Sequence, residues 1–248
     1  MAVGVLVVTG GSRGIGAAVG RLAARGGWSV CLSYRADREA ADALVEEFRD
    51  LGAPARAVRA DMSVEADIVD LFAAAAELGP VAGLVANAGV VAPQRRVDEI
   101  DAARIRHLLE VNVTGLLLCC REAVRRMSTR HGGQGGSIVL MSSVASRLGS
   151  PSEYVDYAAT KGAVDTVGVG LAREVAGESI RVNVVRPGII DTELHASGGD
   201  PDRAARLGPS LPLGRPGTAD EVAGAVLWLL SEQASYCTGT ILDVAGGR

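Results

Sequence analysis

Two side chains one helical turn apart form the pair with the clearest chemistry in this sequence. Tyr157 and Lys161 stand at positions i and i+4, and on a helix such positions share one face. An ordinary tyrosine phenol has a pKa of ~10, which is too high for a ready base. A neighbouring ammonium ion favours the phenolate and lowers that pKa, so Tyr157 is a candidate general acid/base. Tyr154 has no such partner, because the residue four places on is Ala158.

A pair of serines can supply a hydrogen bond to a reacting oxygen. Ser142 and Ser143 follow the apolar run 137–141, which is typical of a buried strand. Ligands bind at the carboxyl ends of strands in parallel sheets, and a hydroxyl there can stabilise developing negative charge. These residues together predict acid/base chemistry on a carbonyl or alcohol. A Tyr-x-x-x-Lys pair alone, by contrast, is often a solvated surface contact.

A glycine-rich turn opens the first predicted helix and indicates a dinucleotide site. An apolar run and an Ala-rich helical stretch flank the turn, whose sequence is Thr9-Gly10-Gly11-Ser12-Arg13-Gly14-Ile15-Gly16. Glycines permit the tight turn and let the backbone approach a pyrophosphate, which the free N–H groups at the helix start attract. Because glycine-rich turns are common, the strand–loop–helix context is what favours cofactor binding over an ordinary turn.

The end of the second predicted strand discriminates between the two nicotinamide dinucleotides. NAD sites usually place an acid there for the ribose 2′-hydroxyl, but the sequence has Tyr34-Arg35 and no acid before Asp37. Arg35 can pair with a 2′-phosphate through a forked contact, and Arg13 can bind its other side. The two cations predict NADP(H), with NAD(H) as a weaker alternative. The competing interpretation is that Arg35 is only a solvated residue.

The elements that must position these residues alternate along the chain. Strands are predicted over residues 5–9, 29–34, 55–60, 81–86, 137–141, 180–185 and 240–244. Helices are predicted over residues 14–25, 37–51, 64–77, 101–109, 111–127, 154–175 and 219–230. This alternation predicts an α/β fold of the Rossmann type. We expect one domain over residues 1–248, in which a doubly wound, parallel, seven-stranded sheet carries helices on both faces.

Composition narrows the classes of function. The chain has 248 residues, of which 48% are hydrophobic, and its net charge of −4 argues against nucleic acid as a partner. No apolar run approaches the roughly 20 residues that span a membrane, and no signal peptide is recognised, so we expect a cytoplasmic protein without a membrane partner. The four cysteines lack metal-ligand spacing, and we expect buried, reduced thiols and no metal.

In combination, these motifs resemble the short-chain dehydrogenase/reductase family, in the single-domain branch that includes bacterial glucose-1-dehydrogenase-like proteins. The segments that carry the resemblance are T-G-x-x-x-G-I-G at 9–16, Asn87-Ala88-Gly89, Tyr157-x-x-x-Lys161 and Pro187-Gly188-x-x-x-Thr192. They occur in the family's order and cover nearly the whole chain. Ala86 replaces the first Asn of the family's Asn-Asn-Ala-Gly. The resemblance implies hydride transfer between NADP(H) and a carbonyl or alcohol carbon of a small molecule.

The resemblance also implies roles for single residues. Ser143 would bind the substrate oxygen, Lys161 would hold the nicotinamide ribose, and Asn112 would bend a helix and hold a water against Lys161. The other implied cofactor contacts are Asp61 and Met62 at the adenine, Asn87, Ala88 and Gly89 beside the ribose, and Pro187, Gly188, Ile190 and Thr192 around the nicotinamide.

Two segments are expected to shape the substrate pocket. Ser143 and Tyr157 are fourteen residues apart, one more than the family usually has, so we expect an extra residue in the loop 150–156. Residues 193–213 are rich in Gly and Pro and predict a mobile substrate lid, in which His195 is interpreted as a solvent-exposed residue. The resemblance further implies a homotetramer. Two alternatives stay open: a non-catalytic NADP(H)-binding sensor or scaffold, and an isomerase or lyase on the same fold.

Overall fold

A parallel sheet forms the centre of the protein, which we describe from a computed structural model over residues 4–248. Its strands are β1 (Val5–Val8), β2 (Ser29–Tyr34), β3 (Ala55–Arg59), β4 (Val81–Ala86), β5 (Gly136–Met141), β6 (Ile180–Pro187) and β7 (Ile241–Val244). They lie in the order β3-β2-β1-β4-β5-β6-β7, and every neighbouring pair runs parallel. The predicted doubly wound sheet is confirmed, and each strand lies within two residues of its predicted bounds.

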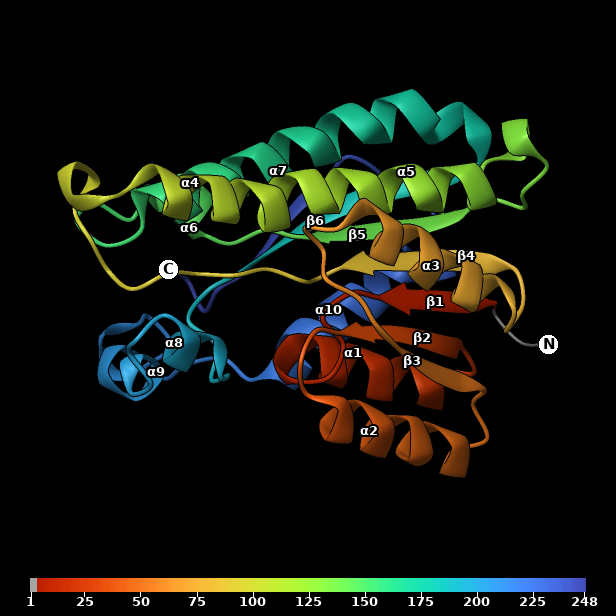
Figure 1. Ribbon diagram of the computed structural model, residues 1–248, viewed down its shortest axis with the longest axis horizontal. Coiled ribbons are helices and arrows are strands. Elements are labelled where there is room, and N and C mark those ends of the chain that lie inside the picture. The colour runs from red at the N-terminus through yellow and green to blue at the C-terminus, as the bar shows by residue number, and fades with distance from the viewer. Residues whose placement is uncertain (1–3) are drawn as a thin grey trace.

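Helices cover both faces of this sheet. They are α1 (Gly14–Arg25), α2 (Arg38–Asp50), α3 (Glu65–Ala76), α4 (Ala102–Leu109), α5 (Gly115–Met127), α6 (Ala145–Leu148), α7 (Val155–Val175), α8 (Leu194–Ser197), α9 (Arg203–Leu207) and α10 (Ala219–Leu230). Figure 1 shows α1, α2 and α10 on one side of the strands and α3, α5 and α7 on the other. None of the helices within residues 4–248 has the length and apolar character needed to cross a membrane.

The central strands are apolar on both faces because both faces are covered. All four residues of β1 are buried. Leu6 and Val8 pack into the core beneath α1, α2 and α10, whereas Val5 and Val7 pack beneath α3, α5 and α7. This is the two-residue period of a strand, and burying each such side chain stabilises the fold by about 1.5–3 kcal/mol. The sheet is therefore a rigid base for whatever lies at its ends.

Parallel strands bring their carboxyl ends to one edge of the sheet. The residues that follow β2, β4, β5 and β6 therefore gather there, although they are far apart in the sequence. Strand order reverses between β1 and β4, which is the position where doubly wound sheets bind ligands. The loop after β1 and Asn87, which follows β4, meet at this reversal. The topology thus explains why the sequence motifs converge.

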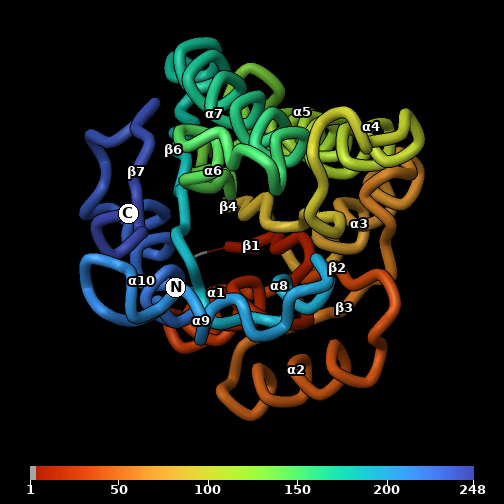
Figure 2. The backbone as a smooth tube through the Cα atoms, turned by 90° about the vertical axis from the view of Figure 1, so that its left-hand side faces the viewer, coloured from red at the N-terminus to blue at the C-terminus, as the bar shows by residue number. Residues whose placement is uncertain are grey.

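Several local elements differ from the sequence prediction. The helix predicted to begin at residue 111 instead starts with a π-helical turn over Glu110–Thr114 and becomes α-helical at α5. Short helices α6, α8 and α9 form where no helix was predicted. Figure 2 shows the segment that contains α8 and α9 passing across the α1 side of the molecule. Periodic patterns do not identify such short elements, because each has only about one turn.

Candidate active site

The glycine loop is held in a conformation that side chains would prevent. Gly10 and Gly14 have φ angles of +61° and +52°, in the left-handed region that favours glycine. A Cβ atom on Gly16 would lie only 2.4 Å from the carbonyl oxygen of Gly10. The N–H of Gly10 donates to the hydroxyl of Ser33 on β2 at 3.0 Å. The turn is therefore closed by its own backbone and by the neighbouring strand.

Asn87 locks this loop to the end of β4. Its side-chain amide donates to the carbonyl oxygens of Thr9 and Gly10, each at 3.0 Å. The hydroxyl of Thr9 in turn accepts from the N–H groups of Asn87 and Ala88 at 3.0 and 2.9 Å. Ala86, which stands where the family has a first Asn, is buried in β4 and pairs with Leu140 of β5. The substitution leaves this part of the sheet intact.

One elongated cavity of about 320 Å³ runs along the carboxyl edge of the sheet. A volume of this size is typical of small-molecule sites. Of the predicted site residues, the following line it: Gly10, Ser12, Arg13, Gly14, Ile15, Tyr34, Arg35, Asp61, Met62, Asn87, Ala88, Gly89, Ser143, Tyr157, Lys161, Pro187, Gly188, Ile190 and Thr192. Gly16 and Asn112 lie behind the cavity wall and act on it through neighbouring residues. Glu193, Leu194 and His195 of the predicted lid segment also line it, as does Ser33, which no sequence motif indicated.

One end of the cavity carries two exposed arginines. Arg13 and Arg35 both line it and are solvent-exposed. Asp37, the first acid after β2, accepts from the N–H of Ala40 at 3.0 Å and thereby caps α2. Its carboxylate therefore has a structural role. Arg35 forms no ion pair within residues 4–248, but its charge helps to lower the pKa of the nearby Asp61 carboxylate. This end is suited to an anion.

Asp61 lies along the same wall at the end of β3. Its carboxylate accepts from the backbone N–H and the hydroxyl of Ser63, at 2.9 and 2.7 Å. These hydrogen bonds lower the pKa of Asp61 below its usual value, so the group is ionised at neutral pH. The carboxylate is thus held in place to accept a hydrogen bond from a ligand amine.

Tyr157, Lys161 and Ser143 meet at the other end of the cavity. The ammonium of Lys161 lies 5.7 Å from the centre of the Tyr157 ring and donates to the carbonyl oxygen of Met141 at 2.7 Å. The hydroxyl of Ser143 accepts from the N–H of Ala145 at 3.1 Å and helps to lower the pKa of the Tyr157 phenol. The three groups come from β5 and α7, so their meeting depends on how this helix packs on the sheet. They form an acid/base constellation of the kind that the residue types predicted.

Burial has the largest effect on the pKa values of Tyr157 and Lys161. It raises the pKa of Tyr157 to about 12, against the smaller lowering by the Ser143 hydrogen bond. It also lowers the pKa of Lys161 to about 8, and the nearby Asp165 carboxylate only partly opposes this. The expectation that Lys161 would lower the pKa of the phenol is therefore wrong for the protein by itself. The ammonium is directed to Met141 rather than to the phenolic oxygen.

Asn112 supports this end of the cavity from behind. It is 1% exposed and lies in the π-helical turn. Its side chain accepts from the N–H of Val90 at 2.8 Å and donates to the carbonyl oxygen of Val90 at 2.9 Å and to Thr160. A Cβ on Gly89 would lie 3.4 Å from the Asn112 oxygen and 3.5 Å from the Lys161 nitrogen, so both atoms approach this glycine. The implied helix bend is present as a π turn.

A second cavity, of about 90 Å³, adjoins Ser143 and Tyr157. Its walls are mainly apolar, and Leu194 and His195 line both cavities. His195 is half-buried and its ring nitrogen Nε2 lies 2.9 Å from the carbonyl oxygen of Ile190. The interpretation of His195 as a solvent-exposed residue is therefore wrong, and burial lowers the pKa of its ring below its usual value. Packing against the residues after β6 was not visible in the sequence.

The loop 150–156 forms the rim of this second cavity. Ser150 and Ser152 have φ angles of +44° and +61°, which are unfavourable for residues with a side chain. The carbonyl oxygen of Glu153 accepts from the N–H of Arg95 at 3.0 Å, so the loop is attached to the segment after β4. A strained, irregular loop is present where the sequence spacing predicts an extra residue.

Comparison with known proteins gives concordant matches. Residues 10–248 match a family model described as Enoyl-(Acyl carrier protein) reductase. The "Uncharacterized oxidoreductase YgfF" of Escherichia coli is 51% identical over 98% of this chain and 99% of its own length. The cis-4-hydroxycyclohexanecarboxylate dehydrogenase of Sinomonas cyclohexanicum is 39% identical over 98% and 95%. A blue fluorescent protein from a metagenomic library, solved in complex with NADPH, is similar in structure, with a TM-score of 0.90, 33% identity and coverage of 99% and 97%.

The chain belongs to the short-chain dehydrogenase/reductase family. It is thus an oxidoreductase of the class that acts on alcohol and carbonyl substrates. The resemblance first drawn from the glycine loop and the Tyr-x-x-x-Lys pair is confirmed.

Proposed function

We propose that the protein transfers a hydride between NADP(H) and a carbonyl or alcohol carbon, with Tyr157 as the general acid/base. The observation that carries the proposal is the arrangement of one cavity, with Arg13 and Arg35 at one end and Tyr157 and Lys161 at the other. β2 and β5 are separated by β1 and β4, so strand spacing puts these ends roughly 14 Å apart. An extended dinucleotide can bridge that separation.

The residues present fit a dinucleotide. No side chain among residues 4–248 caps the start of α1, so its first N–H groups are available to a pyrophosphate. The closely packed glycines of the loop 10–16 leave room for the pyrophosphate, and a Cβ atom at these positions would take up that room. Asp61 would accept a hydrogen bond from the adenine amine, and Thr192 and Ile190 would border the nicotinamide. Arg35 and Arg13 would bind the 2′-phosphate, which is the basis for proposing NADP(H) over NAD(H).

The residues around the reacting carbon have separable tasks. When bound, the cofactor supplies or accepts the hydride, and its oxidised ring adds a positive charge beside Tyr157. That charge favours the phenolate and counteracts the effect of burial on the pKa of Tyr157. In reduction, Tyr157 donates its proton to the substrate oxygen, and Ser143 donates a hydrogen bond to the same oxygen. Lys161 orients the ribose, and Asn112 positions Val90 and Thr160 around this group.

We place the substrate in the second cavity, beneath a lid formed by residues 193–213. The cavity adjoins Ser143 and Tyr157 and is mostly apolar. Arg203 on α9 fastens the lid to the body, because its guanidinium pairs with Glu153 at 2.6 Å and lies 5.1 Å from the centre of the Tyr154 ring. A compact apolar cavity of this kind favours a small ketone or secondary alcohol.

We also propose that the enzyme is a cytoplasmic homotetramer. Leu109 on α4 and Leu117 on α5 are 44% and 46% exposed, and Trp228 beside the edge strand β7 is 43% exposed. A Cβ on Gly162 or on Gly170 would meet open space, so the outer face of α7 is smooth enough for a second helix to approach. Three of the four free cysteines are buried, in keeping with a reducing compartment. A monomer mass in light scattering would contradict the tetramer.

The proposal is tested by titrating the purified protein with NADPH and with NADH and then assaying carbonyl reduction. The panel contains cyclohexanone, 2,3-butanedione, ethyl acetoacetate, D-glucose and a 3-oxosteroid, with the corresponding alcohols assayed for oxidation. We expect tighter binding of NADPH and turnover of at least one member. Binding without any turnover would favour the sensor alternative, whereas failure to bind either dinucleotide would contradict the proposed cavity assignment. Interconversion of substrate without net change of cofactor would indicate an isomerase or lyase.

A further inference from the structure

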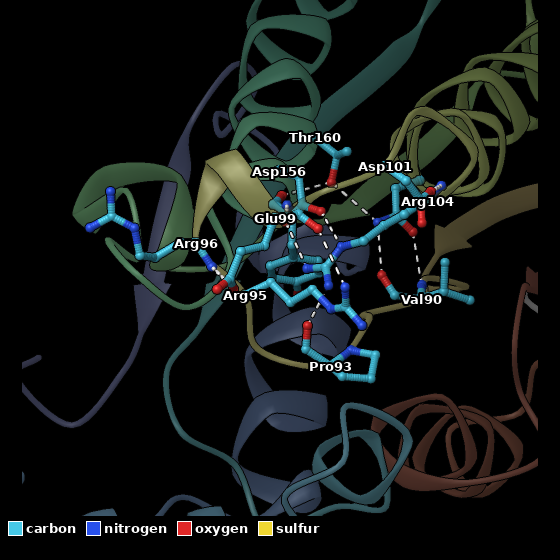
Figure 3. A network of polar contacts seen from close by, with 11 residues as sticks. Val90, Pro93, Arg95, Arg96, Glu99, Asp101, Arg104, Asp156 and Thr160 are labelled. Atoms are coloured by element: carbon cyan, nitrogen blue, oxygen red, sulfur yellow. Dashed lines mark hydrogen bonds and ion pairs between the residues drawn. The ribbon is translucent and has the colours of Figure 1, made fainter.

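A buried ion pair joins α4 to the first turn of the catalytic helix α7. The guanidinium of Arg104 donates to both carboxylate oxygens of Asp156, from Nε at 2.6 Å and from Nη2 at 3.2 Å. The two side chains are only 9% and 7% exposed. A third guanidinium nitrogen donates to the carbonyl oxygen of Pro93, in the segment after β4 (Figure 3). Arg104 therefore connects three separate parts of the chain.

These connections are adjacent to the proposed acid/base. Asp156 directly precedes Tyr157, and its Oδ1 also accepts from the backbone N–H of Tyr157 at 2.9 Å. One helical turn later, Thr160 directly precedes Lys161 and accepts from the Asn112 amide at 3.2 Å. The residues just before Tyr157 and Lys161 are thus each attached to the helical segment that contains α4 and the π turn. Both attachments lie on the same side of α7.

The side chains of Arg104 and Asn112 also hold the chain segment that separates the two cavities. Asn112 binds the backbone of Val90 through both its N–H and its carbonyl oxygen, and Arg104 binds Pro93. Val90 lines the first cavity and Val91 lines the second. A displacement of Arg104 would consequently move the substrate wall together with the start of α7.

We propose that Arg104 and Asp156 are positioning residues for Tyr157, which set its place against the substrate wall and keep the charge beside it balanced. This inference rests on the proposed acid/base function of Tyr157. A bidentate pair fixes geometry more strictly than a single contact. In a buried ion pair the two charges also neutralise each other, and removal of one partner leaves an uncompensated charge in a low-dielectric site. The effects of the two removals on Tyr157 must therefore differ in sign.

The two single variants make that difference measurable. Arg104→Met leaves the Asp156 carboxylate unpaired, which disfavours the phenolate and raises the pKa of Tyr157. Asp156→Asn leaves the Arg104 guanidinium unpaired, which favours the phenolate and lowers that pKa. The double variant carries neither charge and should restore the parental value while still lacking the attachment to Pro93. A merely structural role would not produce opposite shifts.

Other titratable groups face Tyr157 and stay unchanged in these variants. They are Tyr154 before α7, Lys161 on α7, Glu193 before α8, His195 on α8, Arg203 on α9 and Arg248 after β7. The Asp165 carboxylate acts on Lys161 in every variant alike. Differences between variants therefore report the charges at positions 104 and 156.

The experiment is a pH titration of phenolate absorbance in the NADP⁺ complexes, with the signal of Tyr157 isolated by subtracting a Tyr157→Phe variant. We expect the midpoint to rise by about half a unit to one unit in Arg104→Met, to fall by a similar amount in Asp156→Asn, and to return to the parental value in the double variant. Arg126→Met is the matched control. It removes one of the three arginines that pair with Glu122 on α5, a carboxylate whose side chain is 4% exposed, and should leave the midpoint unchanged.

A kinetic arm keeps the test decisive if a single variant does not fold. The double variant has no unpaired buried charge, and we expect its kcat for the panel carbonyl that the parent reduces fastest to fall about tenfold, with the Kd for NADPH within twofold of the parent. Midpoints that shift in the same direction or not at all, or a parental kcat in the double variant, would overturn the inference. Absence of turnover in the parent would instead contradict the proposed function, and the phenolate titration would still test the pair.

Discussion

At the proposed dinucleotide end of the cavity the backbone itself forms the binding surface, whereas charged side chains hold the substrate end together. The first end depends on the positive φ angles of Gly10 and Gly14 and on the contact of Asn87 with the loop. The second depends on pairs such as Arg104–Asp156 and Arg203–Glu153, whose members are about fifty residues apart. Both ends are therefore assembled from distant segments, but backbone conformation and backbone hydrogen bonds fix the first, whereas ion pairs between side chains fix the second.

The largest expected effect comes from placing a side chain in the backbone-built end. In Gly16→Ala, the new Cβ would lie 2.4 Å from the carbonyl oxygen of Gly10 and 2.7 Å from the Asn87 amide nitrogen, so the loop must move. We expect the Kd for both dinucleotides to rise more than about 100-fold, since two or more backbone contacts are lost at once. Gly170→Ala on α7 is the control, because its Cβ would meet open space and tight binding should persist. Parental dinucleotide binding by Gly16→Ala would contradict a backbone-built site.

A smaller effect, on the binding of NADPH more than of NADH, is expected when a charge is removed at the same end. Arg35→Ala removes a cation that the proposed 2′-phosphate requires, and we expect the Kd for NADPH to rise about 10- to 100-fold. The Kd for NADH should change less than about threefold, because NADH lacks that phosphate. Fluorescence titration with the two reduced dinucleotides measures both. Equal losses would show that Arg35 acts structurally and would remove the basis for NADP(H) preference.

A change at the substrate end should weaken substrate binding and leave dinucleotide binding unchanged. Glu153→Gln weakens the pairing with Arg203, whose side chain is only 7% exposed, and loosens the lid. We expect the KM for the carbonyl to rise about tenfold while the Kd for NADPH stays unchanged, because the buried Arg203 charge then keeps only the longer contact with Asp200, at 3.8 Å. Asp42→Asn, which breaks the exposed pair with Arg38 on α2, should alter neither constant. A loss of NADPH binding in Glu153→Gln would show that the two ends are not independent.

The smallest expected effect is the change with pH in the free energy of unfolding that Lys161 causes. Burial lowers the pKa of Lys161 to about 8, below the 10.5 of an ordinary lysine, so above pH 8 the unfolded chain binds the proton that the folded chain has lost. The free energy of unfolding should therefore rise between pH 8 and pH 9, by about 1 kcal/mol relative to Lys161→Met. Urea unfolding of both proteins at the two pH values measures this difference. A difference that does not change between the two pH values would show that Lys161 stays charged in the fold.

Much of the fold followed from the sequence because strands and long helices have regular patterns. The strands and the glycine loop were predicted from apolar runs and from residues that adopt special backbone angles. The π turn at Asn112 and the position of His195 were not, because each results from contacts with segments elsewhere in the chain. Arg104 and Asp156 carried no signal either, since in a sequence both resemble solvated charges, and only tertiary packing buries them together.

The central claim is that Tyr157 transfers the proton, and the most direct measurement compares single-turnover reduction by the parent and by Tyr157→Phe under saturating NADPH. We expect the rate constant to fall by about 100- to 10,000-fold, the usual contribution of acid/base catalysis, while the Kd for NADPH changes less than twofold. Tyr236→Phe, at a fully exposed position, should retain the parental rate. A Tyr157→Phe enzyme that binds NADPH normally and reduces the carbonyl at nearly the parental rate would contradict the account.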